Sequence, residues 1–260
     1  MEKWKMLDPM NLWLKKVRDE PRPEDLIEGI LSTSSFLLLA GRPGIGKTNM
    51  ALQIGLSLAT GTPFLGFKTT EVRTAYLGFE GSKDKLADRI EKVACNFPRT
   101  VLFHPEIIPP LKFKGENINL IEEATRGCKV IIIDPLKYLV PGNYIQPNDA
   151  ISFLTDVRNY MKKNGTSFIF CHHIRKPNPN SLFDPGDLFE SKGATDYAEA
   201  ATSVLLLERE RQKHYPTGGF APVNLDNAVL YFSKTRDAIE AIDPLPIHFD
   251  RQKLLWIKED

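Results

Sequence analysis

The amino-acid sequence predicts an α/β protein with a mostly parallel central sheet flanked by helices and with antiparallel strands near the C-terminus. Up to about residue 171, short apolar runs alternate with helical patterns, as expected when a crossover helix follows each parallel strand. After residue 203, strand patterns follow one another without long helices, which favours antiparallel pairing. We therefore expect a short N-terminal arm, residues 1–34, and a single domain, residues 35–260.

The N-terminal arm carries a short helical pattern. Met10, Leu14 and Val17 recur at helical spacing with Trp13 beside them, and Pro21 ends the pattern. An amphipathic arm of this kind packs either on its own domain or on a neighbouring subunit. We favour its own domain.

The rest of the chain divides into strand and helix patterns in order. We expect strands at residues 36–40, 74–79, 101–103, 129–134, 167–171, 204–207, 228–233, 247–249 and 254–257. We expect helices at residues 49–60, 83–93, 118–126 and 148–164. Ser82 can cap the second helix, and glycines follow the first and the last.

The composition excludes several classes of protein. Charged residues make up 26% of the chain and the net charge is +1, so bulk charge indicates neither disorder nor strong nucleic-acid binding. Cys95, Cys128 and Cys171 lack metal-ligand spacing, which suits reduced thiols. Because the sequence has no secretory signal and no apolar stretch of membrane-spanning length, we expect a cytoplasmic protein without membrane contact.

The strongest functional signal is a glycine-rich loop. It reads Gly41-Arg42-Pro43-Gly44-Ile45-Gly46-Lys47-Thr48 and is followed by Asn49. The loop lies between a predicted strand and a predicted helix, the context of a phosphate-binding loop, whose backbone N–H groups and helix N-terminus attract an anion. Lys47 would reach the β- and γ-phosphates of ATP, and the Thr48 hydroxyl would bind Mg²⁺. The alternative is a glycine-rich turn without a ligand.

Two acidic residues follow neighbouring strand patterns. Asp134 ends an apolar run and is the expected second Mg²⁺ ligand, held directly or through water. Glu80 follows the strand at 74–79 and is the expected base for the water that attacks the γ-phosphate. The alternative for Asp134 is a helix cap or a turn former, and the alternative for Glu80 is a solvated turn residue.

A histidine pair, His172 and His173, ends the strand at 167–171. Since neighbours on a strand face opposite ways, only one of the two can point into the site. That one could contact the γ-phosphate or the attacking water, and a structural role is the alternative.

These residues together resemble the RecA-fold P-loop ATPases, and most of all the RepA-type replicative helicases of plasmids. The resemblance rests on the loop, Glu80, the run at 131–136 (IIIDPL) and the run at 171–176 (CHHIRK), taken in order, and extends from Glu24 to the C-terminus. It implies a RecA-like ATPase domain with ATP and Mg²⁺ as cofactors. Lys47, Glu80 and His173 would be the catalytic residues.

The resemblance also implies a homo-oligomeric ring, usually hexameric, with single-stranded DNA in its channel and other replication proteins as partners. Residues 137–147 and 175–193 occupy the places of the DNA-facing loops. Charges for phosphates and rings for stacking would come from Lys137, Tyr138, Tyr144, Arg175 and Lys176. Ordinary solvated loop residues are the alternative.

Lys234-Thr235-Arg236 is similar to the Lys-x-Arg element of related ring helicases, whose cations reach a neighbour's ATP site. Arg236 would then be an arginine finger, with Lys234 beside it. In the RepA pattern the finger lies near the strand at 204–207, where this chain has no arginine at 198–202. Arg209 and Arg211 therefore stay open as alternatives, and so does weak activation of one subunit by another.

Three functions are compatible with these residues. The leading one is an ATP-driven motor on single-stranded DNA. The second is a small-molecule kinase, which Glu80 and Asp134 favour less, because they suit water as the nucleophile. The third is a nucleotide-gated scaffold, like the circadian-clock and archaeal regulatory relatives of the RecA fold.

Overall fold

The computed structural model describes residues 8–20, 22–174, 195–209, 211–212, 221–222 and 226–259. Six strands are mutually parallel: β3 (Phe36–Gly41), β4 (Thr74–Gly78), β5 (Phe103–Ile107), β6 (Val130–Asp134), β7 (Ser167–His173) and β8 (Ser203–Arg209). Three strands extend them in antiparallel fashion: β11 (Asn227–Thr235), β12 (Leu245–Asp250) and β13 (Leu255–Lys258). Two short pairs lie outside the sheet: β1 (Asp25–Ile27) with β2 (Leu31–Ser32), and β9 (Arg211–Gln212) with β10 (Ala221–Pro222).

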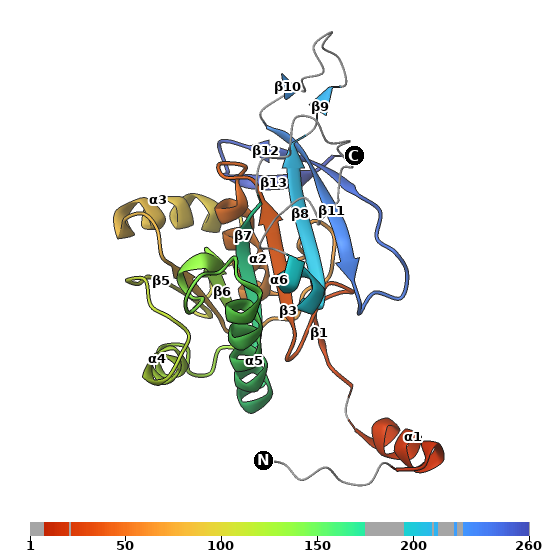
Figure 1. Cartoon of the computed structure of the whole chain (residues 1–260). Helices are drawn as coiled ribbons and strands as arrows, with labels where there is room; N and C mark the ends of the chain where they lie inside the picture. The colour runs from red at the N-terminus through yellow and green to blue at the C-terminus, as the bar shows by residue number, and fades with distance from the viewer. Residues whose placement is uncertain are drawn as a thin grey trace.

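The nine strands form one sheet in the order β13-β12-β11-β8-β3-β7-β6-β4-β5 (Figure 1). The helices are α1 (Met10–Asp19), α2 (Lys47–Thr60), α3 (Lys83–Ala94), α4 (Glu116–Ala124), α5 (Pro147–Asn164) and α6 (Thr195–Ala200), with a 3₁₀ turn, η1 (Leu136–Tyr138). The expected mostly parallel sheet with antiparallel C-terminal strands is confirmed.

The strand register brings the carboxyl ends of the central strands side by side, and these ends form one edge of the sheet. Gly41 at the end of β3 pairs with His173 of β7 and with Leu207 of β8. Gly78 at the end of β4 pairs with Asp134 at the end of β6. Because parallel strands share their direction, the loops that follow β3, β4, β6 and β7 all leave from this edge.

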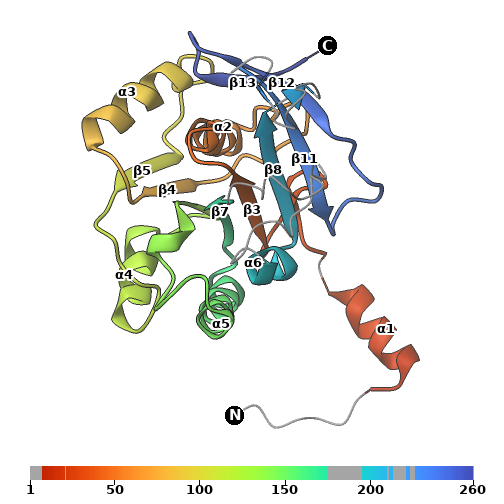
Figure 2. The ribbon, with the colours of Figure 1, turned by 45° about the horizontal axis from the view of Figure 1, so that its top comes forward.

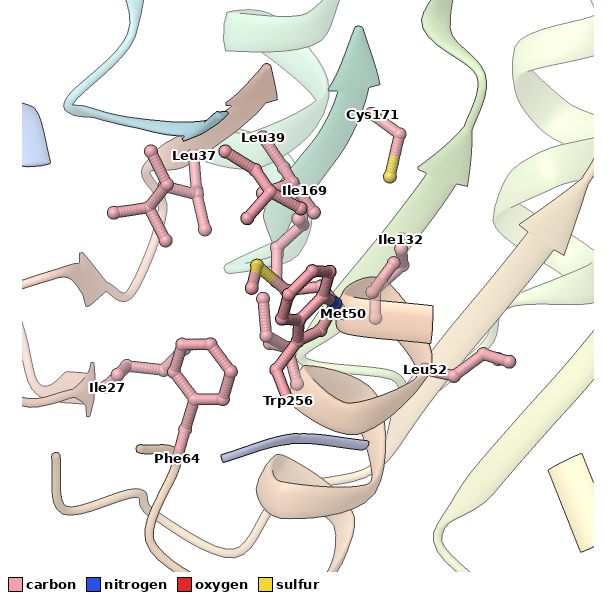
Figure 3. Packing of buried hydrophobic residues seen from close by; sticks show 14 of the residues in the cluster. Ile27, Leu37, Leu39, Met50, Leu52, Phe64, Ile132, Ile169, Cys171 and Trp256 are labelled. Atoms are coloured by element: carbon pink, nitrogen blue, oxygen red, sulfur yellow. The ribbon is translucent and has the colours of Figure 1, made fainter. Parts of the chain in front are cut away.

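Helices cover both faces of the sheet (Figure 2). On one face, side chains of α2, α3 and β13 pack against side chains of the central strands such as Leu37 and Leu39. Figure 3 shows these two leucines near Met50 of α2 and Trp256 of β13. On the other face, α4, α5 and α6 pack on Phe36 and Leu38. Successive strand residues therefore serve opposite cores, which explains why the central strands are apolar throughout.

The two longest helices follow local sequence rules. Eleven of the fourteen residues of α2 are buried, because the helix packs on the central strands, on the edge strand β13 of the same sheet and on α3. It ends at Gly61, which has the left-handed conformation. Helix α5 begins with Pro147 in its first turn and ends at Gly165, which is also left-handed.

The first helix does not pack as expected. No residue of α1 is buried against the described part of the chain, and the side chains of Met10 and Trp13 are 75% and 53% exposed. Figures 1 and 2 show α1 apart from the sheet. The expectation that it packs on its own domain is wrong for this helix, whose apolar stripe has no partner among the described residues.

Residues of the same arm at β1 and β2 do join the core, with Leu26 and Ile27 buried. The division at residue 34 stays a prediction.

One strand was expected in the wrong place. The prediction gave residues 101–103, whereas β5 spans Phe103–Ile107 and Val101 is 83% exposed. The strand is at the edge of the sheet, where a proline such as Pro105 is tolerated and polar side chains can face water. Its sequence therefore lacks the apolar pattern of a central strand.

No helix within the described ranges is long and apolar enough to cross a bilayer.

Candidate functional site

The glycine-rich loop, residues 41–48, lies where β3 ends and α2 begins. Gly44 and Gly46 have φ angles of 75° and 106°, which favour glycine. A Cβ at Gly46 would lie 2.8 Å from the Trp256 ring, so a side chain there would displace that ring. Gly46 is also the N-cap of α2, whose N-terminus carries a partial positive charge. This geometry suits a phosphate ligand.

Lys47 is held over this loop. Its Nζ donates hydrogen bonds of 2.8 Å to the carbonyl oxygens of both Gly41 and Arg42. Burial lowers the pKa of Lys47 to about 8, although the nearby Asp134 and Glu80 carboxylates favour its charged form. The ammonium is therefore already positioned at the loop, and a phosphate would offer it better acceptors than carbonyl oxygens.

Asp134 connects the loop to the neighbouring strand β6. The Thr48 hydroxyl donates to Asp134 Oδ2 at 2.7 Å, and the Tyr76 hydroxyl donates to the same oxygen at 2.9 Å. Asp134 is 9% exposed. Burial, with the Asp134 charge as the second cause, raises the pKa of the Tyr76 phenol, so Tyr76 remains a donor.

These groups fit Mg²⁺ bound together with a nucleotide. Thr48 and Asp134 offer the oxygen ligands that Mg²⁺ prefers, and the ion usually takes its other ligands from phosphates and water. Within the described ranges no three acidic, histidine or cysteine side chains gather into a preformed metal site. The site would therefore hold the ion with the nucleotide rather than alone.

Glu80 follows β4 at the same edge and is paired with Lys137 of η1. The Lys137 Nζ lies 2.7 Å from Glu80 Oε1 and 4.6 Å from the centre of the Tyr138 ring. The hydrogen bond from Lys137 is the main cause that lowers the pKa of Glu80. Lys137, which we expected to face DNA, thus contacts the expected base. Tyr138, expected in the same role, packs against the Lys137 ammonium.

Two cavities are relevant to the location of the site. Thr48, Glu80 and Asp134 line a cavity of about 230 Å³, together with Lys85 and Arg89 of α3. A larger cavity of about 480 Å³ lies at the amino ends of β6 and β7, and none of the predicted site residues lines it. The smaller cavity therefore brings together Thr48, Glu80 and Asp134, whereas Lys47 and His173 do not line it.

The two histidines face opposite ways, as expected. His172 is buried between two rings, with centroids 6.3 Å from Tyr144 and 5.8 Å from Tyr197, and burial lowers its pKa to about 4. Burial also lowers the pKa of His173, with Lys47 as the second cause. Among the described residues, His173 Nδ1 has no hydrogen-bond partner. His173 is therefore the member of the pair beside the loop.

Lys234 and Arg236 lie at the opposite edge of the sheet from the glycine-rich loop. Thr235 pairs with Ser203 at the start of β8, whereas the loop follows the other end of the neighbouring strand. Lys234 Nζ donates to the carbonyl oxygens of α6 at Ala198 and Glu199, and Arg236 donates to the latter. They do not contact the nucleotide site of their own chain.

Of the other basic residues predicted to act on ATP or DNA, only some belong to the described part of the chain. Arg209 donates from Nη2 to the Gly44 carbonyl oxygen at 3.3 Å, so it touches the loop of its own chain. The structure does not describe the side chain of Arg211. It describes neither Arg175 nor Lys176.

Three further residues of the predicted site have defined positions. Asn49 lies in the first turn of α2, and its Oδ1 is buried without a partner in the described part of the chain. Ile45 is buried in the core. Tyr144, expected to stack on bases, packs instead on His172, and its carbonyl oxygen accepts a hydrogen bond from Tyr197 at 3.0 Å.

Two contacts were not anticipated from the sequence. Tyr76 lies four residues before Glu80, and strand periodicity could have placed it on the same side of β4. Trp256 contacts the loop from the far end of the chain, donating from Nε1 to the Gly46 carbonyl oxygen at 3.4 Å. No local pattern indicates a contact across 210 residues.

A comparison with known families agrees with this geometry. A profile described as an AAA domain matches residues 6–179, more than half of the chain, and these include the glycine-rich loop, Glu80, Asp134 and both histidines. No curated protein matches the sequence.

We predict that His172 makes the stability of the fold depend on pH. Its pKa is about 4 in the folded chain and 6.5 when exposed, so the unfolded chain binds more protons between these values. Its contribution is complete above 6.5 and is lost as the pH falls through 4. Between about pH 7.5 and pH 5 it amounts to about 2 kcal/mol.

Urea unfolding at both pH values checks this prediction. The variant His172→Phe keeps an aromatic ring between Tyr144 and Tyr197 but cannot bind a proton, so its stability should change less with pH. Equal pH dependence of the variant and the natural chain would refute the assignment.

Proposed function

This chain belongs to the AAA domain family of P-loop ATPases, and from that premise we propose that it is a motor that hydrolyses ATP with Mg²⁺ and acts on single-stranded DNA. The observation that carries the proposal is the convergence of three groups at one cavity. Thr48 and Asp134 are joined by a 2.7 Å hydrogen bond, and Glu80 lines the same space. Nucleotide phosphates and an attacking water both need these groups.

In the proposed reaction each residue has one role. Lys47 exchanges the carbonyl oxygens of Gly41 and Arg42 for phosphate oxygens. Thr48 and Asp134 would hold Mg²⁺, which neutralises phosphate charge when bound. Glu80 accepts a proton from the attacking water. His173, whose Nδ1 has no partner among the described residues, could contact the γ-phosphate or that water.

Two features support assembly into a homo-oligomer, with a hexameric ring as the proposed form. Lys234 and Arg236 lie at the opposite edge of the sheet from the nucleotide loop of the same chain, so an arginine finger at Arg236 would act on a neighbour. Helix α1 presents Met10 and Trp13 to solvent, and a helix of ten residues is marginal alone in water. A neighbouring subunit would stabilise it.

The support for single-stranded DNA comes from the segment after β6. Lys137 and Tyr138 follow Asp134 within four residues, so a strand bound there would lie beside the nucleotide cavity. Lysine charge and aromatic rings are the groups that single strands bind. Other replication proteins would be the partners of such a motor.

A second candidate is a nucleotide-gated scaffold, in which ATP assembles the ring and a protein partner binds it. The packing of Tyr144 on His172 favours this candidate, because it removes one of the rings expected to stack on bases. The net charge of +1 is also compatible with a protein partner.

Substitutions in the loop and at Glu80 should separate binding from turnover. Lys47→Ala removes the ammonium that contacts phosphates, so tight nucleotide binding should be lost. Glu80→Gln keeps the shape of the side chain but cannot accept a proton, so binding should persist while hydrolysis falls at least about a hundredfold. Binding of a fluorescent ATP analogue and phosphate release measure the two effects. Normal hydrolysis by Glu80→Gln would show that another group is the base.

The action on DNA is tested by the rate of ATP hydrolysis with and without oligodeoxythymidylate. The motor predicts several-fold stimulation, and mass determination with a non-hydrolysable ATP analogue should give a multiple of the chain mass. An unchanged rate combined with ATP-dependent assembly would instead support the scaffold. Consumption of ATP only after addition of a metabolite would indicate a kinase.

A further inference from the structure

The contact between Glu80 and Lys137 joins the expected base to the segment expected to bind DNA. Glu80 follows the end of β4, and Lys137 belongs to η1, three residues after Asp134. Their side-chain atoms Oε1 and Nζ lie 2.7 Å apart. The Lys137 ammonium also lies over the ring of Tyr138.

This contact opposes the role of a base. A carboxylate oxygen that accepts a hydrogen bond from an ammonium has fewer lone pairs to offer to water. The Lys137 hydrogen bond also holds the pKa of Glu80 below its ordinary value, which weakens its pull on a proton. In this arrangement Glu80 is therefore restrained.

We propose that Lys137 is a positioning residue that restrains Glu80, and that the phosphates of a bound single strand release Glu80 by taking Lys137 as their partner. The inference rests on the proposed function and adds to it a route by which DNA binding reaches the base. Lys137 acts through Glu80 and does not itself line the cavity of Thr48, Glu80 and Asp134.

The ion pair is weak enough to be exchanged. The side chains of Lys137 and Glu80 are 32% and 47% exposed, and exposed pairs of this kind favour the paired state by only about two- to fivefold. A chain of phosphates is a strong competitor for a lysine ammonium, because binding releases counterions. The two partners can therefore separate when a strand approaches η1.

The backbone on either side of the pair is held by other contacts. Phe79 donates from its backbone N–H to the Asp134 carbonyl oxygen at 2.9 Å, and Phe113 donates to that of Leu139 at 2.7 Å. Leu136 and Leu139 are both fully buried. Removal of the Lys137 side chain should therefore free Glu80 without unfolding this region.

The test compares four full-length chains: the natural one, Lys137→Met, Lys137→Arg and Lys163→Met. Lys163 forms a similar exposed pair with Glu122 on α4, 2.9 Å long, away from the nucleotide cavity, and is the matched control. ATP hydrolysis is measured with Mg-ATP alone and with oligodeoxythymidylate. A fluorescent ATP analogue checks that each variant binds nucleotide.

We expect Lys137→Met to hydrolyse ATP without DNA about two- to fivefold faster than the natural chain, and to lose most of its stimulation by DNA. Lys137→Arg keeps a cation beside Glu80, so its basal rate should lie below that of Lys137→Met. Lys163→Met should match the natural chain. In Lys137→Met the acid limb of the pH–rate profile should also move to higher pH, because Glu80 loses the hydrogen bond that lowers its pKa.

The outcomes distinguish this inference from the proposed function. If DNA stimulates the natural chain but the basal rate of Lys137→Met is unchanged or lower, the restraint is refuted and the motor stands. If DNA does not stimulate the natural chain while Lys137→Met is faster, the restraint stands, but release by DNA and the motor are both refuted. If Lys163→Met is faster to the same degree, the gain is not specific to Glu80 and the inference is refuted.

Discussion

The hydrogen bond between Thr48 and Asp134 is the contact on which the site depends. It joins the first turn of α2 to the end of β6, although 86 residues separate the two in sequence. The strand order makes it possible, because β7 alone separates β3 from β6. With the loop, the helix N-terminus and the carboxylate fixed to one sheet edge, a nucleotide finds its ligands preorganised rather than assembling them.

The sequence predicted those parts of the fold and site whose signal is local. The apolar run before Asp134 marks a buried strand, and the glycine-rich loop has the fixed positions of a phosphate-binding loop. Strand β5 was misplaced because an edge strand can carry His104 and Pro105. The contacts of Trp256 and Tyr76 with the site come from tertiary packing, which a single sequence does not report.

The roles of individual residues also depend on tertiary packing, which a single sequence does not report. The sequence showed that only one histidine could face the site, but the rings of Tyr144 and Tyr197 identify His172 as the buried one. Lys137 was expected to bind DNA and is found on Glu80. A charged loop residue has several possible partners, and the choice among them depends on the position of η1 beside β4.

The central claim is that the main chain of one loop binds the phosphates of a nucleotide. Calorimetric titration of the full chain with Mg-ATP and, separately, with adenosine tests it most directly. The account predicts one tight site for Mg-ATP and no measurable heat with adenosine, which lacks the phosphates. Equal affinity for both ligands, or no binding of Mg-ATP, would contradict it.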